Sequence, residues 1–147
     1  LLRTAGSLEL RFVCPDPYAY ALEDEIFVIS GTGTHEIERL TGNAESEPVY
    51  FLKGVISASS SSYISLITNG EELRIAGPLS EGETLVIDSG MVTAKVTDAA
   101  GNTLRNGLPS LQELNFPILR KGVNNVEVVT ENATFTELKI QAKSRWR

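Results

Sequence analysis

Short segments in which apolar and polar residues alternate recur along this sequence and constrain its fold most strongly. In residues 92–97 the apolar face is formed by Val92, Ala94 and Val96, and similar segments are 8–12, 126–128 and 137–142. A period of two is typical of β-strands that bury one face, whereas amphipathic helices repeat their apolar residues every three to four positions. Helical spacing extends at most over one turn, at residues 110–115 after Pro109. The sequence therefore predicts an all-β protein with antiparallel strands.

Turn residues separate these segments at intervals typical of a β-sandwich. The clearest turn is Asn69-Gly70, between the predicted strands Tyr63–Thr68 and Glu72–Ala76. Asn and Gly both tolerate positive φ, which the type I′ turn of a two-residue hairpin requires. Further breaks follow at residues 77–78, 81–82, 89–90, 100–102, 106–107 and 121–122. About 8 to 11 short strands in one domain favour a two-sheet antiparallel β-sandwich of jelly-roll or similar connectivity.

The chain length of 147 residues suits one domain with its own hydrophobic core. Its composition changes at residues 14–20, where two prolines interrupt regular strand pairing. We expect residues 1–22 to be the last strand of an upstream domain followed by a linker, and residues 23–147 to be the sandwich. The sequence opens on Leu1 and not on Met, so we interpret it as part of a longer chain.

Charge and hydropathy disfavour nucleic acid and membrane as partners. The 19 acidic and 13 basic residues give a net charge of −6, which offers nucleic acid no net positive field. The longest uncharged stretch, residues 54–70, contains six serines and is therefore no membrane-spanning helix. The single cysteine, Cys14, cannot form an internal disulfide. We expect it to be a buried, reduced side chain in a protein made in a reducing compartment.

The residue types that carry catalysis are present, but not in the patterns that the chemistry requires. His35 is the only histidine, it has no partner at zinc-binding spacing, and no G-x-S-x-G nucleophile motif occurs. The acidic residues do not follow the spacing of a calcium loop, so we interpret them, with Asp24 and Glu25 among them, as solvated faces and edges. The sequence predicts no catalytic, cofactor-binding or metal-binding residue. His35 is expected to be an exposed or hydrogen-bonded strand residue.

Five aromatic residues are the candidates for contact with a partner or a glycan: Tyr18, Tyr20, Tyr50, Tyr63 and Trp146. An aromatic ring combines a large apolar face with, in Tyr and Trp, one polar group that can bind a partner. Trp146 lies between two arginines at the C-terminus. We expect it to pack across the sandwich with a cation over its ring, and the alternative is an exposed anchor for a partner.

Four segments in order resemble a family of phage proteins. They are residues 12–20 (FVCPDPYAY), 69–73 (NGEEL), 116–124 (FPILRKGVN) and 145–147 (RWR). The chain resembles the distal tail protein of long-tailed, non-contractile phages, specifically the end of its ring domain and its C-terminal domain. The resemblance implies a galectin-like β-sandwich joined to an N-terminal domain that assembles as a hexameric ring.

The resemblance also implies a function in the virion and not in catalysis. Such a ring is a hub at the tail tip, or baseplate, that links the tail tube to tail-associated proteins, and in some phages its outer domain holds receptor-binding proteins for host adsorption. Assembly would take place in the cytoplasm of the bacterial host. The fragment itself is expected to be a monomer or a weak dimer.

A carbohydrate-binding, lectin-like module for cell-wall glycans is the alternative function, because the same sandwich is a common lectin scaffold. Two exposed aromatic residues on one concave face beside Asn, Asp or Arg would favour it. A wall-degrading hydrolase is the least favoured function.

Overall fold

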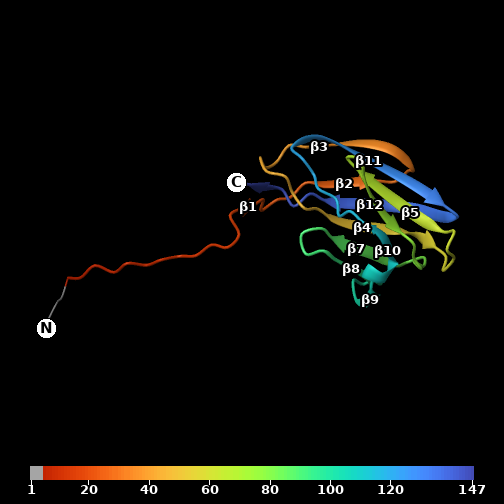
Figure 1. Cartoon of the computed structure of the whole chain (residues 1–147), viewed down its shortest axis with the longest axis horizontal. Helices are drawn as coiled ribbons and strands as arrows, with labels where there is room; N and C mark the ends of the chain where they lie inside the picture. Colours follow the sequence, from red (N-terminus) through yellow and green to blue (C-terminus); the bar gives the residue numbers. More distant parts are fainter. Residues whose placement is uncertain (1–4) are drawn as a thin grey trace.

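The computed structural model describes residues 5–147 as two antiparallel sheets packed face to face, with one extended N-terminal segment that leaves them (Figure 1). The six-stranded sheet has the order β2 (Ile26–Ile29), β12 (Ala133–Gln141), β4 (Val49–Ile56), β7 (Thr84–Asp88), β8 (Thr93–Thr97) and β9 (Thr103–Asn106). The five-stranded sheet has the order β10 (Leu111–Leu114), β6 (Glu71–Ile75), β5 (Tyr63–Thr68), β11 (Gly122–Glu131) and β3 (Gly33–Arg39). A separate pair joins β1 (Ala19–Tyr20) to β13 (Arg145–Trp146).

The core lies between the inner faces of the two sheets. Alternate residues of each strand point inward, and the largest buried side chains include Tyr50, Leu52, Ile64, Leu66 and Leu85. Leu138 and Ile140 are 0% exposed, as the alternation in residues 137–142 predicts. Burial of such apolar faces is the main stabilising contribution to a sandwich of this kind. The predicted all-β, two-sheet antiparallel sandwich is confirmed.

The predicted hairpin at Asn69-Gly70 is also confirmed. It joins β5 to β6, and Thr68 lies opposite Glu71 in the register. Asn69 has φ of 50° and Gly70 has φ of 87°, the two positive values that a type I′ turn requires.

Two local predictions within the sandwich are wrong. Val92 is not part of the inner face: it lies in the turn between β7 and β8 with φ of 55°, and 55% of its surface is exposed. The single helical turn is a 3₁₀ turn at Leu108–Ser110, before the predicted position, and residues 111–114 form β10. Pro109 has a fixed φ that suits the first turn of a helix, so it lies within this turn and does not precede it.

Residues 5–18 extend away from the sandwich and belong to no strand (Figure 1). The apolar residues of the alternating segment 8–12 are exposed: Leu8 by 82%, Leu10 by 66% and Phe12 by 86%. Cys14 is exposed too, which corrects the prediction that it is buried, because this segment contacts no core that could enclose it. None of the helical segments among residues 5–147 is long and apolar enough to cross a membrane.

Candidate functional site

The extended N-terminal segment joins the sandwich beside the C-terminus, where β1 pairs with β13 (Figure 1). Ala19 pairs with Trp146 and Tyr20 pairs with Arg145. The loop 41–47 packs against this pair so closely that a Cβ on Gly42 would lie 2.6 Å from the backbone oxygen of Arg145. We call residues 16–20, 41–47 and 143–147 the junction.

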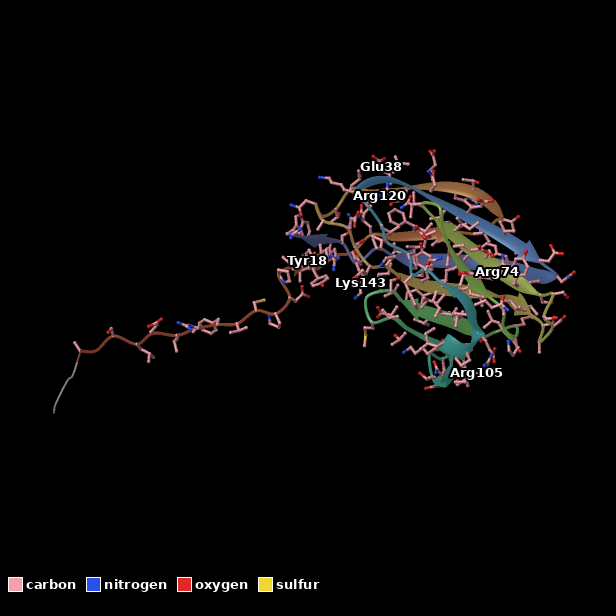
Figure 2. All side chains as sticks on the ribbon, in the orientation of Figure 1. Tyr18, Glu38, Arg74, Arg105, Arg120 and Lys143 are labelled. Carbon is pink, nitrogen blue, oxygen red and sulfur yellow. The ribbon has the colours of Figure 1, made fainter. Side chains whose placement is uncertain are left out.

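Arg145 connects all three parts of the junction. Its guanidinium lies 3.9 Å from the centroid of the Tyr18 ring, a cation–π contact with the N-terminal segment. Figure 2 labels Tyr18 where this segment reaches the sandwich. Its Nε donates to the backbone oxygen of Glu45 at 2.6 Å, and its Nη1 lies 3.2 Å from Oε2 of Glu47. Only 12% of the Arg145 side chain is exposed, so solvent screens these contacts less than those of a surface arginine.

Asp16 orders the proline-rich part of the segment. Its Oδ1 accepts a hydrogen bond from the backbone N–H of Tyr18 at 3.1 Å, which is an Asx turn. Its Oδ2 accepts from the hydroxyl of Tyr20 at 2.8 Å, and this bond is the main cause of a raised pKa of Tyr20. The two tyrosines are therefore held in fixed positions by one carboxylate.

Two acidic residues fix the opposite side of the junction. Asp24 accepts from the backbone N–H groups of Lys143 and Ser144 at 2.7 and 3.1 Å. Glu25 accepts from the backbone N–H groups of Leu40 and Thr41 at 2.9 and 3.1 Å. The interpretation of these two carboxylates as solvated edges is wrong, because each satisfies two backbone donors of another segment. Their partners lie 15 to 120 positions away in sequence, so no local pattern could indicate them.

Arg39 is a further residue that the sequence does not single out. It is 0% exposed beneath the loop 41–47, where Nε donates to the backbone oxygen of Arg120 at 3.1 Å and Nη2 to that of Ala44 at 2.6 Å. Burial lowers the pKa of its guanidinium. A buried charge that loses its hydrogen-bond partners is costly in free energy, because no solvent can replace them. The hydrogen bonds of Arg39 therefore fix the base of this loop.

The structure brings three of the five predicted contact residues together. Tyr18, Tyr20 and Trp146 lie in the junction, where Tyr20 is 49% and Trp146 is 40% exposed. Tyr50 is 0% exposed in the core, and its hydroxyl lies 2.7 Å from Oγ1 of Thr68, so it presents no surface to a partner. Tyr63 is on the outer face of the five-stranded sheet, 4.4 Å from the guanidinium of Arg74.

The cation near the C-terminal tryptophan covers a different ring from the expected one. Arg145 stacks on Tyr18, because adjacent residues of a strand point to opposite faces and Arg145 therefore points away from its neighbour Trp146. Trp146 lies at the edge of the junction and not across the sandwich.

The contacts of the junction hold the N-terminal segment against the sandwich. Residues 5–147 contain no group of three or more His, Cys, Asp or Glu side chains placed to hold a metal ion. His35 lies in β3 with Nε2 2.7 Å from the backbone oxygen of Gly31, which confirms the expected hydrogen-bonded strand histidine.

Together these features define a class of protein: an all-β sandwich tethered through an extended segment that is fastened beside its own C-terminal strand. Residues 41–146 match the family described as the siphovirus-type tail component, C-terminal domain. The chain belongs to this family of phage tail proteins, and the predicted resemblance to the siphophage distal tail protein is confirmed.

One solved structure shows the same fold at low sequence identity. It is the crystal structure of the Dit protein (gp 19.1) of phage SPP1, described as a paradigm of the hub adsorption apparatus in phages that infect Gram-positive bacteria. The TM-score is 0.60 at 15% identity, over 87% of this chain and 49% of that one. This chain therefore spans about half the length of the SPP1 protein. The comparison with curated proteins finds no match.

Proposed function

We propose that this chain is the outer domain of a hub at the tip of a phage tail, where it links the tail tube to tail-associated and receptor-binding proteins. The family membership and the shared fold with a hub protein support this function. The observation that carries it is the junction. Arg145, Asp16 and the β1–β13 pair fasten the sandwich to its own linker. These contacts would fix the direction in which the sandwich projects from another domain.

The N-terminal residues fit the last strand of that other domain. Leu8, Leu10 and Phe12 alternate with charged residues and are largely exposed, so this segment has an apolar face with no sheet to cover it among residues 5–147. We assign residues 1–22 to a ring domain and its linker and residues 23–147 to the projecting sandwich. The hexameric ring forms through the ring domain, and assembly takes place in the bacterial cytoplasm.

The carbohydrate-binding alternative has one observation in its favour, the proximity of Tyr18, Tyr20 and Trp146 at the junction. Sugar binding needs a free aromatic face, and Arg145 covers one face of Tyr18 while Asp16 occupies the hydroxyl of Tyr20. The rings of Tyr18 and Tyr20 thus make contacts within the chain. A screen of host wall glycans against this chain tests the alternative, and saturable binding that Trp146→Ala abolishes would favour it.

Electron microscopy of the parent polypeptide, combined with its mass from light scattering, tests the hub. We expect a six-fold ring with six outward lobes. A monodisperse monomer of the parent polypeptide would contradict the proposal. A stable hexamer of residues 1–147 alone would contradict the assignment of ring formation to another domain, since we expect this chain to be a monomer or a weak dimer.

A further inference from the structure

The outer face of the six-stranded sheet carries a row of side chains with an unusual order. The strand registers place Lys139 of β12 beside Phe51 of β4, Phe51 beside Val86 of β7, and Val86 beside Lys95 of β8. Phe51 and Val86 are half-buried and both lysines are exposed. The row therefore consists of two apolar residues between two cations, on neighbouring strands that run side by side in Figure 1.

This row forms the floor of a hollow with a volume of about 470 Å³. The hollow is also lined by Lys53, Glu137 and Asp98. Glu137 lies 3.9 Å from Nζ of Lys53, so these two charges offset each other. The carboxylate of Asp98 accepts hydrogen bonds from the backbone N–H groups of Ala100 and Asn102 at 2.9 Å each and closes its own turn.

Lys95 and Lys139 are the cations in the hollow that have no ion-pair partner among residues 5–147. The carboxylate of Asp98 has no ion-pair partner there either, but its hydrogen bonds with residues 100 and 102 hold it within its own turn. Nζ of Lys139 lies 5.7 Å from the centroid of the Phe51 ring, a weak cation–π contact on an exposed surface. An acidic group that approaches the hollow therefore meets two cations and displaces no internal carboxylate.

The opposite face of the sandwich has the opposite charge. The outer face of the five-stranded sheet carries several glutamates on its outward-pointing positions: Glu36, Glu38, Glu72, Glu113 and Glu127. Only Arg74 among the outward residues of β5 and β6 offsets them. In a chain with a net charge of −6, the hollow is thus a local basic site, and complementary charge favours an acidic occupant.

The spacing of the row defines the shape of that occupant. Lys139 and Lys95 lie three strands apart, which corresponds to about 14 Å at ~4.8 Å per strand. In an extended peptide, residues i, i+2 and i+4 point to one side, and i to i+4 spans roughly 13 Å. Carboxylates at i and i+4 can therefore reach the two lysines while an apolar side chain at i+2 rests on Phe51 and Val86.

We propose that this hollow binds an extended segment of a partner protein that carries two acidic residues four positions apart and an apolar residue midway between them. The inference deepens the proposed function and rests on it for the origin of the partner, a protein of the same phage tail. The chemistry of recognition depends only on Lys95, Lys139, Phe51 and Val86.

Titration with a defined peptide, followed by amide NMR shifts of the full chain, tests the proposal. The probe is the seven-residue peptide TETLTET, which has glutamates at its second and sixth positions and a leucine at its fourth. We expect saturable shifts confined to β4, β7, β8 and β12. The peptide TQTLTQT lacks the carboxylates and the peptide TETSTET lacks the leucine. Each is expected to bind with an affinity at least about tenfold lower than that of the probe.

Charge-reversal variants supply the matched comparison. The double variant K95E/K139E is expected to weaken binding of the probe by about tenfold or more, since two favourable charge contacts become repulsive. The control R120E/K121E makes the same change of charge at exposed residues outside the hollow and is expected to bind like wild type.

Three results would overturn the proposal: no binding of the probe, equal binding by K95E/K139E and wild type, or tighter binding of the anionic polysaccharide dextran sulfate than of the peptide. The last result would assign the hollow to a polyanionic glycan. The titration requires neither a ring nor another tail protein. A failure here therefore leaves the hub function to its own test by microscopy.

Discussion

Arg145 shows how one side chain can combine several weak contacts into one fixed geometry. Its contacts with Tyr18, the backbone of Glu45 and the carboxylate of Glu47 come from different directions. Each contributes about 1 kcal/mol or somewhat more when it is partly shielded from solvent. Because they share one guanidinium, they strengthen or fail together.

Arg145→Ala is expected to release the N-terminal segment and leave the sandwich folded. Amide hydrogen exchange of residues 18–21 should become at least about tenfold faster, which corresponds to roughly 1.4 kcal/mol of lost local stability. The core strands β4 and β12 should keep their protection. Arg147→Ala is the control, since the side chain of this nearby residue stacks on no aromatic ring among residues 5–147. Unchanged exchange of residues 18–21 in R145A would show that Arg145 does not hold the segment.

Glu83 and Arg105 form a second arginine contact, with two parallel hydrogen bonds of 2.8 and 2.9 Å. These bonds, together with one from the backbone N–H of Ser80, lower the pKa of Glu83 to about 2 from an ordinary value of 4.5. A carboxylate whose pKa is lowered by folding stabilises the folded state above its unfolded pKa. This contribution is lost as the pH falls from about 4.5 through about 2.

Glu83→Gln is expected to lower the free energy of unfolding at neutral pH by no more than about 1 kcal/mol, because the Arg105 side chain is 38% exposed and solvent screens the pair. The difference between variant and wild type should shrink as the pH approaches 2. Urea unfolding at a series of pH values measures both effects. The exposed neighbour Glu81 provides the control Glu81→Gln, and a difference that persists at acid pH would contradict the explanation.

At the scale of elements, two glycines test how strands and turns are built. Gly70 has φ of 87° in the β5–β6 hairpin, and a Cβ there would meet no atom within 4 Å. Gly54 lies in the middle of β4, where a Cβ would be 2.5 Å from the backbone oxygen of Thr134 in β12. The first glycine is needed for its backbone conformation, and the second allows two strands to approach closely.

Gly70→Ala is expected to cost about 1 kcal/mol through backbone strain alone. Gly54→Ala is expected to cost more, about 2 to 3 kcal/mol, because β4 and β12 must move apart at the centre of the sheet. Urea denaturation of the two variants compares them directly. A smaller loss for Gly54→Ala than for Gly70→Ala would contradict the close approach.

The strands could be predicted because their signal is local. The period of two in residues 137–142 indicates which side chains are buried. The residue types of the Asn69-Gly70 turn indicate positive φ. Val92 misled the prediction, since an apolar residue in a turn continues the alternation without facing the core. The alternation of residues 8–12 is equally regular, yet these residues form no strand because a strand also requires a neighbour.

The junction could be predicted only in part. Tyr18, Tyr20 and Trp146 are candidates because they are aromatic, and the structure brings them together. The sequence shows Arg145 only as a neighbour of the tryptophan, because its bond to Glu45 joins residues 100 positions apart. Arg39 and Asp24 have the same non-local character. Such contacts depend on how the two sheets pack, so composition and residue spacing cannot predict them.

At the scale of the whole molecule, the sandwich is independent of the first residues of the described segment. Residues 5–13 are exposed throughout and contact no core. Deletion of residues 1–13 is therefore expected to change Tm by less than about 2 °C. Deletion of residues 1–20 removes β1, Tyr18 and the Asp16 turn, and we expect it to lower Tm by about 3 to 6 °C. Differential scanning calorimetry measures both, and equal values for the two deletions would contradict the role of the junction.

Charge is distributed unevenly over the sandwich. The net charge of −6 is the sum over the whole chain. Within it, the six-stranded sheet carries the basic hollow and the five-stranded sheet carries the acidic face. Two partners of opposite charge could therefore approach the same domain from opposite sides without competition. The strand order that separates β8 and β12 from β3 and β6 creates this division.

The fastening of β1 to β13 has a mechanical consequence. Tension on residues 5–18 is borne first by a two-residue pairing and one arginine stack, which are weaker than the core they precede. When they open, the load passes to the hydrogen bonds of Asp24 and Glu25 before it reaches β2. Under tension the junction is therefore expected to open before the sandwich unfolds.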